Sequence, residues 1–183
     1  METTKNEMTP YAKQFFNKLS NYLDTKNYFY GSIQRDDYFP QSSDIDVDIF
    51  TSNESSTIAK LQNFLGVKKY EFKKFVYSVG KNKKLIYGKK VKYEDADNNF
   101  STELSIYKEE DKDEILNVHR SKIFLPFFIS WILIFLKFLY YNLGLLPKEI
   151  FIYLKNSTMN LLGDSKFLVT DISKPKNDEE NPK

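Results

Sequence analysis

Hydrophobic and polar positions repeat with two different periods along the chain, and these periods predict the order of its elements. Residues 8–24 carry apolar side chains every three or four positions, which is typical of an amphipathic helix, and Thr9 before Pro10 suits its start. Residues 52–65 show the same spacing and end at Gly66. Alternating or β-branched and aromatic runs predict strands at 27–30, 44–51, 67–79, 85–93 and 100–107. This order predicts an α+β fold with a mixed, mainly antiparallel sheet flanked by helices.

The pattern changes after residue 110, where an acidic stretch gives way to a long apolar segment. Residues 123–141 contain only Ser130 and Lys137 as polar positions, and a second, shorter helix is expected at 148–162. A helix that is apolar nearly all round lies either in a protein interior or in lipid. Residues 123–162 are therefore expected to form a membrane anchor, as a transmembrane helix or hairpin, or a helical segment packed on the sheet.

These patterns divide the chain into three predicted parts. Residues 8–110 form the predicted folded domain, residues 111–165 the apolar helical segment, and residues 171–183 a polar, proline-containing tail that is expected to be disordered. Residues 1–9 have no apolar core of a secretory signal, so the domain is expected in the cytoplasm rather than outside the cell. Basic residues at the start of the apolar segment also favour a position of the domain on the cytoplasmic side of a membrane.

Composition narrows the chemistry that the chain can support. Of its 183 residues 41% are hydrophobic and 16% aromatic, which excludes a disordered protein. There is no Cys and one His, so a disulfide scaffold, a thiolate site, a Cys nucleophile and a His-rich zinc site are excluded. The net charge of +2 conceals an uneven distribution, with an acidic strand and a lysine-rich stretch.

The acidic strand is the sharpest feature. Asp44, Asp46 and Asp48 alternate with aliphatic residues, so the three carboxylates share one face of the strand while the aliphatic residues can pack on helices. Like charges at this spacing repel each other unless a cation lies between them. Hard oxygen ligands favour Mg²⁺ or Mn²⁺ over Zn²⁺, so a divalent metal site is predicted. Asp48 is expected to pair with a lysine; the alternative is that Asp46 and Asp48, rather than Asp44 and Asp46, form the metal pair.

A group of residues that precedes the acidic strand is suited to binding phosphate. Gly31 allows close approach of a backbone, Ser32 offers a hydroxyl donor, and Arg35 can pair with phosphate oxygens. Phosphate donors so close to metal-binding carboxylates predict a nucleoside-triphosphate site.

Gly31 and Ser32, followed at a short distance by Ser43, Asp44, Ile45 and Asp46, resemble the signature of the nucleotidyltransferase superfamily with the DNA polymerase β-like palm. The resemblance covers about residues 12–107. It implies that Gly31 and Ser32 contact the triphosphate and that Asp44 and Asp46 hold the metal ions.

The resemblance also implies a third carboxylate from a later strand. Glu103 is the choice, because it alternates with Leu104 and Ile106, and Asp97 is the second choice. The implied reaction transfers a nucleoside monophosphate from an NTP to a hydroxyl group with two metal ions, and Glu103 can also serve as general base. The alternative is a catalytically inactive nucleotide-binding or membrane-associated interaction module of the same fold.

Lysines crowd residues 68–92, where Glu71 is the single acidic residue and aromatic side chains are interleaved. Such a hairpin can follow a nucleic-acid backbone or an anionic membrane surface, or its lysines can be a solvated face that protects edge strands. The sequence leaves these alternatives open.

Overall fold

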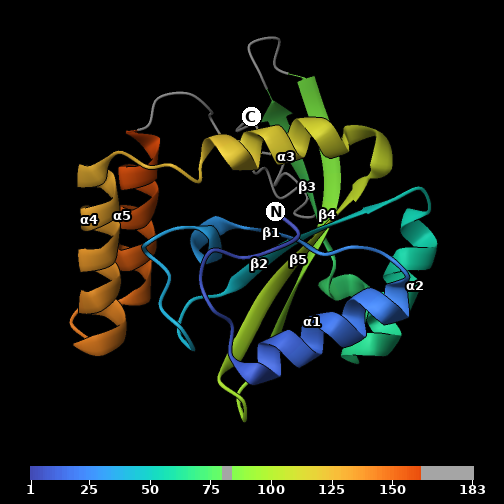
Figure 1. Cartoon of the computed structure of the whole chain (residues 1–183), viewed down its shortest axis with the longest axis horizontal. Coiled ribbons are helices and arrows are strands. Elements are labelled where there is room, and N and C mark those ends of the chain that lie inside the picture. The colour runs from blue at the N-terminus through green and yellow to red at the C-terminus, as the bar shows by residue number, and fades with distance from the viewer. Residues whose placement is uncertain (80–83, 162–183) are drawn as a thin grey trace, which may run out of the picture.

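The computed structural model describes residues 1–79 and 84–161, which form a five-stranded mixed sheet with helices on both faces (Figure 1). The strands are β1 (Tyr28–Tyr30), β2 (Ile45–Thr51), β3 (Lys73–Val79), β4 (Lys84–Asp95) and β5 (Phe100–Lys108). The α-helices are α1 (Pro10–Leu23), α2 (Glu54–Leu65), α3 (Lys112–Ser121), α4 (Phe127–Lys137) and α5 (Lys148–Asn160). Short helical turns are η1 (Gly31–Gln34), η2 (Lys69–Glu71), η3 (Glu109–Asp111) and the π-helical η4 (Phe138–Asn142).

The sheet order is β1-β2-β5-β4-β3, with β2 and β5 parallel and the other neighbouring pairs antiparallel. The predicted α+β fold with a mixed, mainly antiparallel sheet is confirmed. Both helices expected in the first 65 residues form where the pattern placed them. The Thr9 side chain accepts a hydrogen bond from the Ala12 amide at the start of α1, and Gly66 ends α2 in the left-handed region.

One face of the sheet carries the main hydrophobic core beneath α1 and α2. The aliphatic residues of β2 (Ile45, Val47 and Ile49) are buried there. They pack with Leu19 of α1 and Leu61 of α2, which are fully buried. Burial of each such side chain stabilises the fold by about 1.5–3 kcal/mol. Because strand side chains alternate, the aspartates of β2 are left on the opposite face.

The opposite face is partly covered by α3, which the hydrophobic pattern does not predict as a separate element. Ile115 and Leu116 of α3 pack on Phe50, Phe75 and Tyr107 of the sheet. The apolar stripe of α3 is short and its neighbours are charged, so the helical period is weak in the sequence. This helix covers one end of the face and leaves the end that carries Asp46 to other elements.

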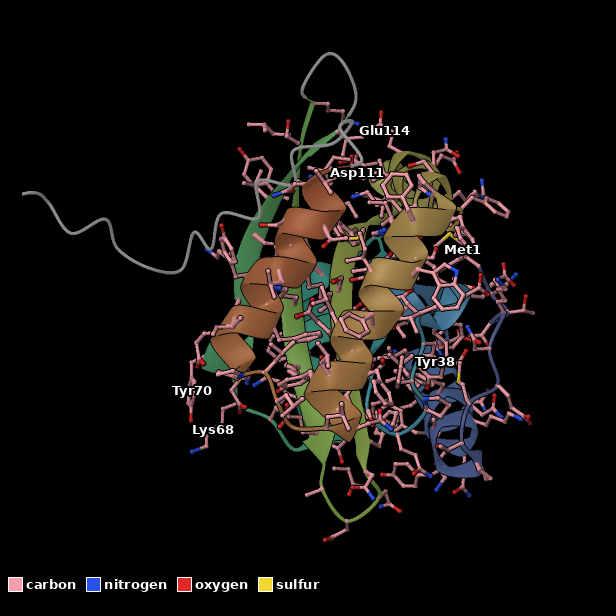
Figure 2. The ribbon with its side chains drawn as sticks, turned by 90° about the vertical axis from the view of Figure 1, so that its left-hand side faces the viewer. Met1, Tyr38, Lys68, Tyr70, Asp111 and Glu114 are labelled. Carbon is pink, nitrogen blue, oxygen red and sulfur yellow. The ribbon has the colours of Figure 1, made fainter. Side chains whose placement is uncertain are left out.

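The apolar segment is broken into pieces rather than one helix. Pro126 precedes α4, which ends at Lys137 and continues as the π-helical turn η4 before a loop leads into α5. Helices α4 and α5 lie side by side at one side of the molecule (Figures 1 and 2). Within residues 1–79 and 84–161, no helix combines the length and apolarity needed to cross a membrane, so the expected transmembrane helix over 123–141 is not found there. The expected disordered tail (171–183) and the tip of the lysine-rich hairpin (80–83) lie outside the described residues.

Candidate active site

Strand β2 places Asp46 at the centre of a carboxylate-bearing face. In the parallel pairing of β2 with β5, Asp46 lies opposite Glu103, and in the antiparallel pairing with β1 it lies opposite Tyr30. Register partners on neighbouring strands point to the same face. The structure therefore brings Glu103 beside Asp46, with Asp44 just before β2. Asp97, the second choice, lies exposed in the turn between β4 and β5.

Gly31 directly follows β1 and its backbone lies against the Asp46 carboxylate. Its φ of +72° is in the left-handed region, which glycine adopts without strain. A Cβ atom at this position would overlap Oδ2 of Asp46 and lie 3.0 Å from its Cγ. Two independent requirements, the backbone angle and the close approach, therefore select glycine here. This contact joins the predicted phosphate-binding residues to the predicted metal-binding strand.

Replacing Gly31 by alanine is expected to displace the Asp46 carboxylate. We expect a loss of about 1–2 kcal/mol of unfolding free energy from the left-handed backbone alone, and in addition about a hundredfold loss of any nucleotidyl transfer. Gly66→Ala is the matched control, because Gly66 has a φ of +70° and an alanine Cβ there would meet no atom within 4 Å. Equal effects of G31A and G66A on transfer would contradict this account. Urea denaturation and a transfer assay measure the two quantities.

The Asp46 carboxyl is in an environment that disfavours its charge. Burial raises the pKa of Asp46 to about 7, the charges of Glu103 and Asp44 add to the rise, and Lys155 of α5 and Arg35 oppose it. A bound cation would favour the ionised form of such a group. Without such a cation, Asp46 is protonated at a higher pH than a surface carboxylate is.

Two lysines of β4 hold the other carboxylates. Lys90 Nζ lies 3.2 Å from Oε2 of Glu103, and Lys92 Nζ lies 3.4 Å from Oδ2 of Asp44. Both lysines share the carboxylate-bearing face, since Lys92 is the register partner of Glu103. Ammonium groups therefore balance part of the negative charge on this face.

The described residues contain no group of three His, Asp or Glu side chains placed to hold a metal ion together. The donor chemistry nevertheless fits a hard divalent cation: three carboxylates share one face, and the charge of Asp46 is strongly disfavoured by burial. Asp44, Asp46 and Glu103 are the residues that would hold such an ion.

Ser32 is the second residue of η1 and Arg35 directly follows its end, and both are buried. The Arg35 guanidinium donates to both carboxylate oxygens of Asp37, at 2.8 and 3.1 Å. Lys137 of α4 also binds Asp37, with 3.0 Å between its Nζ and Oδ2, and donates to the Asp37 carbonyl and to Ser43 Oγ. Arg35 is therefore already paired within the chain, and the same cluster attaches α4 to the loop before β2.

Asp48 has a different partner from the one that the sequence suggested. The expected lysine pairing is wrong: Asp48 Oδ2 lies 3.1 Å from Nε2 of His119, and both side chains are buried. Burial raises the pKa of Asp48, and His119 opposes the rise. His119 stacks on Tyr30 at a ring distance of 4.0 Å. The interior position of His119 was not predicted; its spacing of four from Ile115 is the signal that could have placed it on the buried side of α3.

Several lysines of the hairpin form ion pairs with acidic residues of the same chain. From the sequence, nucleic-acid binding was one possible role of these lysines. Besides the two site lysines, Lys89 Nζ lies 2.7 Å from Glu54, and Lys84 contacts Asp111 and Glu114. Figure 2 shows Asp111 and Glu114 at one end of the sheet, and Lys68 and Tyr70 projecting at the other. The hairpin is thus partly neutralised within the described residues. Lys81 and Lys83 lie outside them.

Comparison with known proteins adds one result. A family model described as a nucleotidyltransferase domain matches residues 11–125, which is more than half of the chain. No curated protein sequence and no solved structure matches the chain. The matched region contains β1 to β5, α2, α3 and all of α1 except its first residue, and it includes Gly31, Asp46 and Glu103.

Proposed function

The chain belongs to the nucleotidyltransferase domain family, and from this premise we propose that it transfers a nucleoside monophosphate from an NTP to a hydroxyl acceptor with a divalent metal ion. The observation that carries the proposal is the close approach of the Gly31 backbone to Asp46, which in turn lies opposite Glu103. A phosphate chain at Gly31 would lie beside the carboxylates.

Each residue of the site has a role in this proposal. Asp44, Asp46 and Glu103 hold the metal, Gly31 and Ser32 receive the triphosphate, and Glu103 can accept the proton of the attacking hydroxyl. A bound Mg²⁺ or Mn²⁺ would neutralise charge on the phosphates and lower the pKa of the attacking hydroxyl. Lys90 and Lys92 pair with Glu103 and Asp44, so these ion pairs would have to open for both carboxylates to hold a metal ion.

The direct test is incubation of the full chain with Mg²⁺ or Mn²⁺, each of the four labelled NTPs and hydroxyl-bearing acceptors that include RNA and protein. We expect incorporation of label, release of pyrophosphate and complete dependence on the divalent ion. Chelation by EDTA before mixing is the control. If none of the NTPs releases pyrophosphate with either metal although the protein binds them, catalysis by this site is refuted.

A second function is favoured by the lysine contacts alone. Lys90 and Lys92 already supply positive charge to Glu103 and Asp44, as a bound cation would. A catalytically inactive module that binds nucleotide would keep such contacts permanently. Nucleotide binding that is unaffected by Mg²⁺ and leads to no turnover would favour this function over transfer.

A further inference from the structure

Helix α4 is apolar on both sides: Ile129, Leu133 and Leu136 are buried, and its exposed side carries no charged residue, unlike a helix on the surface of a soluble protein. Its Lys137 is buried and bound to Asp37. Six large apolar side chains are exposed instead, and we call them the α4 outer face: Phe127, Phe128, Trp131, Ile132, Phe135 and Phe138. Phe127 is 77% exposed, and Trp131 and Phe135 are 58% and 59% exposed.

The α4 outer face is large for a monomer. At about 100° per residue, its six positions fall within about 140° of one side of the helix, without a charged residue among them. Large side chains of this kind carry about 150–250 Å² each, so the face exposes on the order of 600 Å². Patches of this size on a monomer mark interaction sites. Figure 2 shows α4 on the side of the molecule turned to the viewer, in front of the sheet.

The charges around this face distinguish among its partners. Between Glu114 and Glu149 the chain has no acidic residue. Arg120, near the end of α3, and Lys148, at the start of α5, are exposed on the two chain segments that flank α4. These two cations outnumber the one exposed acid beside them, Glu149, so two copies of the chain meeting through this face would bring like charges together, whereas an anionic surface would be attracted.

We infer that the α4 outer face binds the surface of an anionic lipid bilayer, with α4 lying in the plane of the interface. A short helix with an aromatic face and basic flanks has the features of an interfacial helix, and tryptophan is enriched at that depth. The length of α4 suits this position, and its Lys137 and Ser130 face the protein rather than the lipid. The buried Lys137–Asp37 contact then joins the bound helix to the loop before β2. This inference does not depend on the proposed transfer activity.

The test uses Trp131 as a built-in probe, because it is the one tryptophan of the chain. The full chain is mixed with vesicles of phosphatidylcholine alone, or of phosphatidylcholine with phosphatidylserine. We expect co-flotation with the anionic vesicles, a blue shift of the Trp131 emission and quenching by brominated lipid. If the chain stays unbound, or if it binds while the Trp131 emission is unchanged, the inference is overturned.

Two sets of variants locate the contact. Phe128→Ser with Phe135→Ser keeps the tryptophan and is expected to weaken vesicle binding about tenfold for each side chain lost. Leu85→Ser with Tyr87→Ser is the matched control, since these residues of β4 are 53% and 60% exposed and lie outside the face. Arg120→Gln and Lys148→Gln are each expected to weaken binding to anionic vesicles about fivefold and to leave binding to neutral vesicles unchanged. Equal binding of the outer-face and control variants overturns the inference.

The remaining alternative is that the α4 outer face binds a second copy of the chain, and sedimentation measurements test it. We expect the wild-type chain and the Phe128→Ser, Phe135→Ser variant to have the same monomeric mass in the absence of lipid. A dimer that this variant converts to monomer, together with a Trp131 emission that vesicles do not change, overturns the lipid inference and assigns the face to a second copy of the chain. Far-UV circular dichroism shows that each variant is folded.

Discussion

Replacing Asp46 by asparagine is expected to reduce nucleotidyl transfer by roughly a thousandfold or more without loss of stability. Asparagine keeps the shape of the side chain but removes the negative charge, so several kcal/mol of metal-assisted charge stabilisation would be lost. The fold does not need this charge. Burial raises the pKa of Asp46 to about 7, which means that the folded state disfavours its ionised form. At pH 8 the unfolding free energy of the variant is therefore expected to equal or exceed that of the wild type.

The matched control for Asp46→Asn is Asp97→Asn, the same chemical change at an exposed carboxylate in the turn before β5. Transfer by the Asp97 variant is expected to be unchanged. A single-turnover assay with labelled NTP measures the rate, and urea denaturation measures the stability. Loss of transfer in the Asp97 variant, or full activity of the Asp46 variant, would show that the carboxylates are wrongly assigned.

Replacing Asp37 by alanine is expected to lower the unfolding free energy by about 3–5 kcal/mol, because it leaves two buried cations without their partner. The side chains of Arg35, Asp37 and Lys137 are 10%, 1% and 4% exposed. The neighbouring Asp36 is the control, since it pairs with Lys5 at a site where both side chains are more than half exposed. Asp36→Ala is expected to cost at most about 1 kcal/mol. Equal costs in urea denaturation at pH 7 would contradict the structural role of Asp37.

The cluster of Arg35, Asp37 and Lys137 also makes the stability cost of the Asp37 substitution depend on pH. Burial alone would raise the pKa of Asp37, but the Arg35 and Lys137 cations outweigh it and hold the pKa at about 2, below the ordinary value of 3.8. A lowered pKa contributes stability that is complete above pH 3.8 and is lost as the pH falls towards 2. The stability difference between wild type and the Asp37 variant is thus expected to shrink by about 2 kcal/mol over this interval.

Much of the fold could be predicted from the sequence, because it depends on local pattern. Helices α1 and α2 and four of the strands lie within a few residues of the predicted ranges, whereas the strand expected at 67–79 begins only at Lys73, after the helical turn η2. The strict alternation of β2 also assigns Asp44, Asp46 and Asp48 to one face, since side chains in a strand alternate whatever the rest of the chain does. Helix α3 was not predicted because its neighbours are charged, and the late start of α4, after Pro126, was not predicted because the apolar run is continuous.

The site could be predicted only in part. The position of Glu103 opposite Asp46 agrees with the choice made from alternation, although alternation alone could not exclude other strand registers. Arg35 was expected at a phosphate, and the structure pairs it with Asp37 two positions further on. The sequence indicates that these residues are charged, but it does not contain the distance between them.

By itself, the sequence determined which residues share a strand face, which helices have an apolar side and which kinds of ligand the chain offers. Tertiary structure alone decided the pairings: Asp48 with His119, Lys90 with Glu103, and Lys137 with Asp37. The physical reason is that periodicity arises from the local geometry of the backbone, whereas an ion pair depends on how distant segments pack. Lys137 is the clearest case, since its polarity looked like an interruption of an apolar helix and is in fact the contact that attaches this helix to the site.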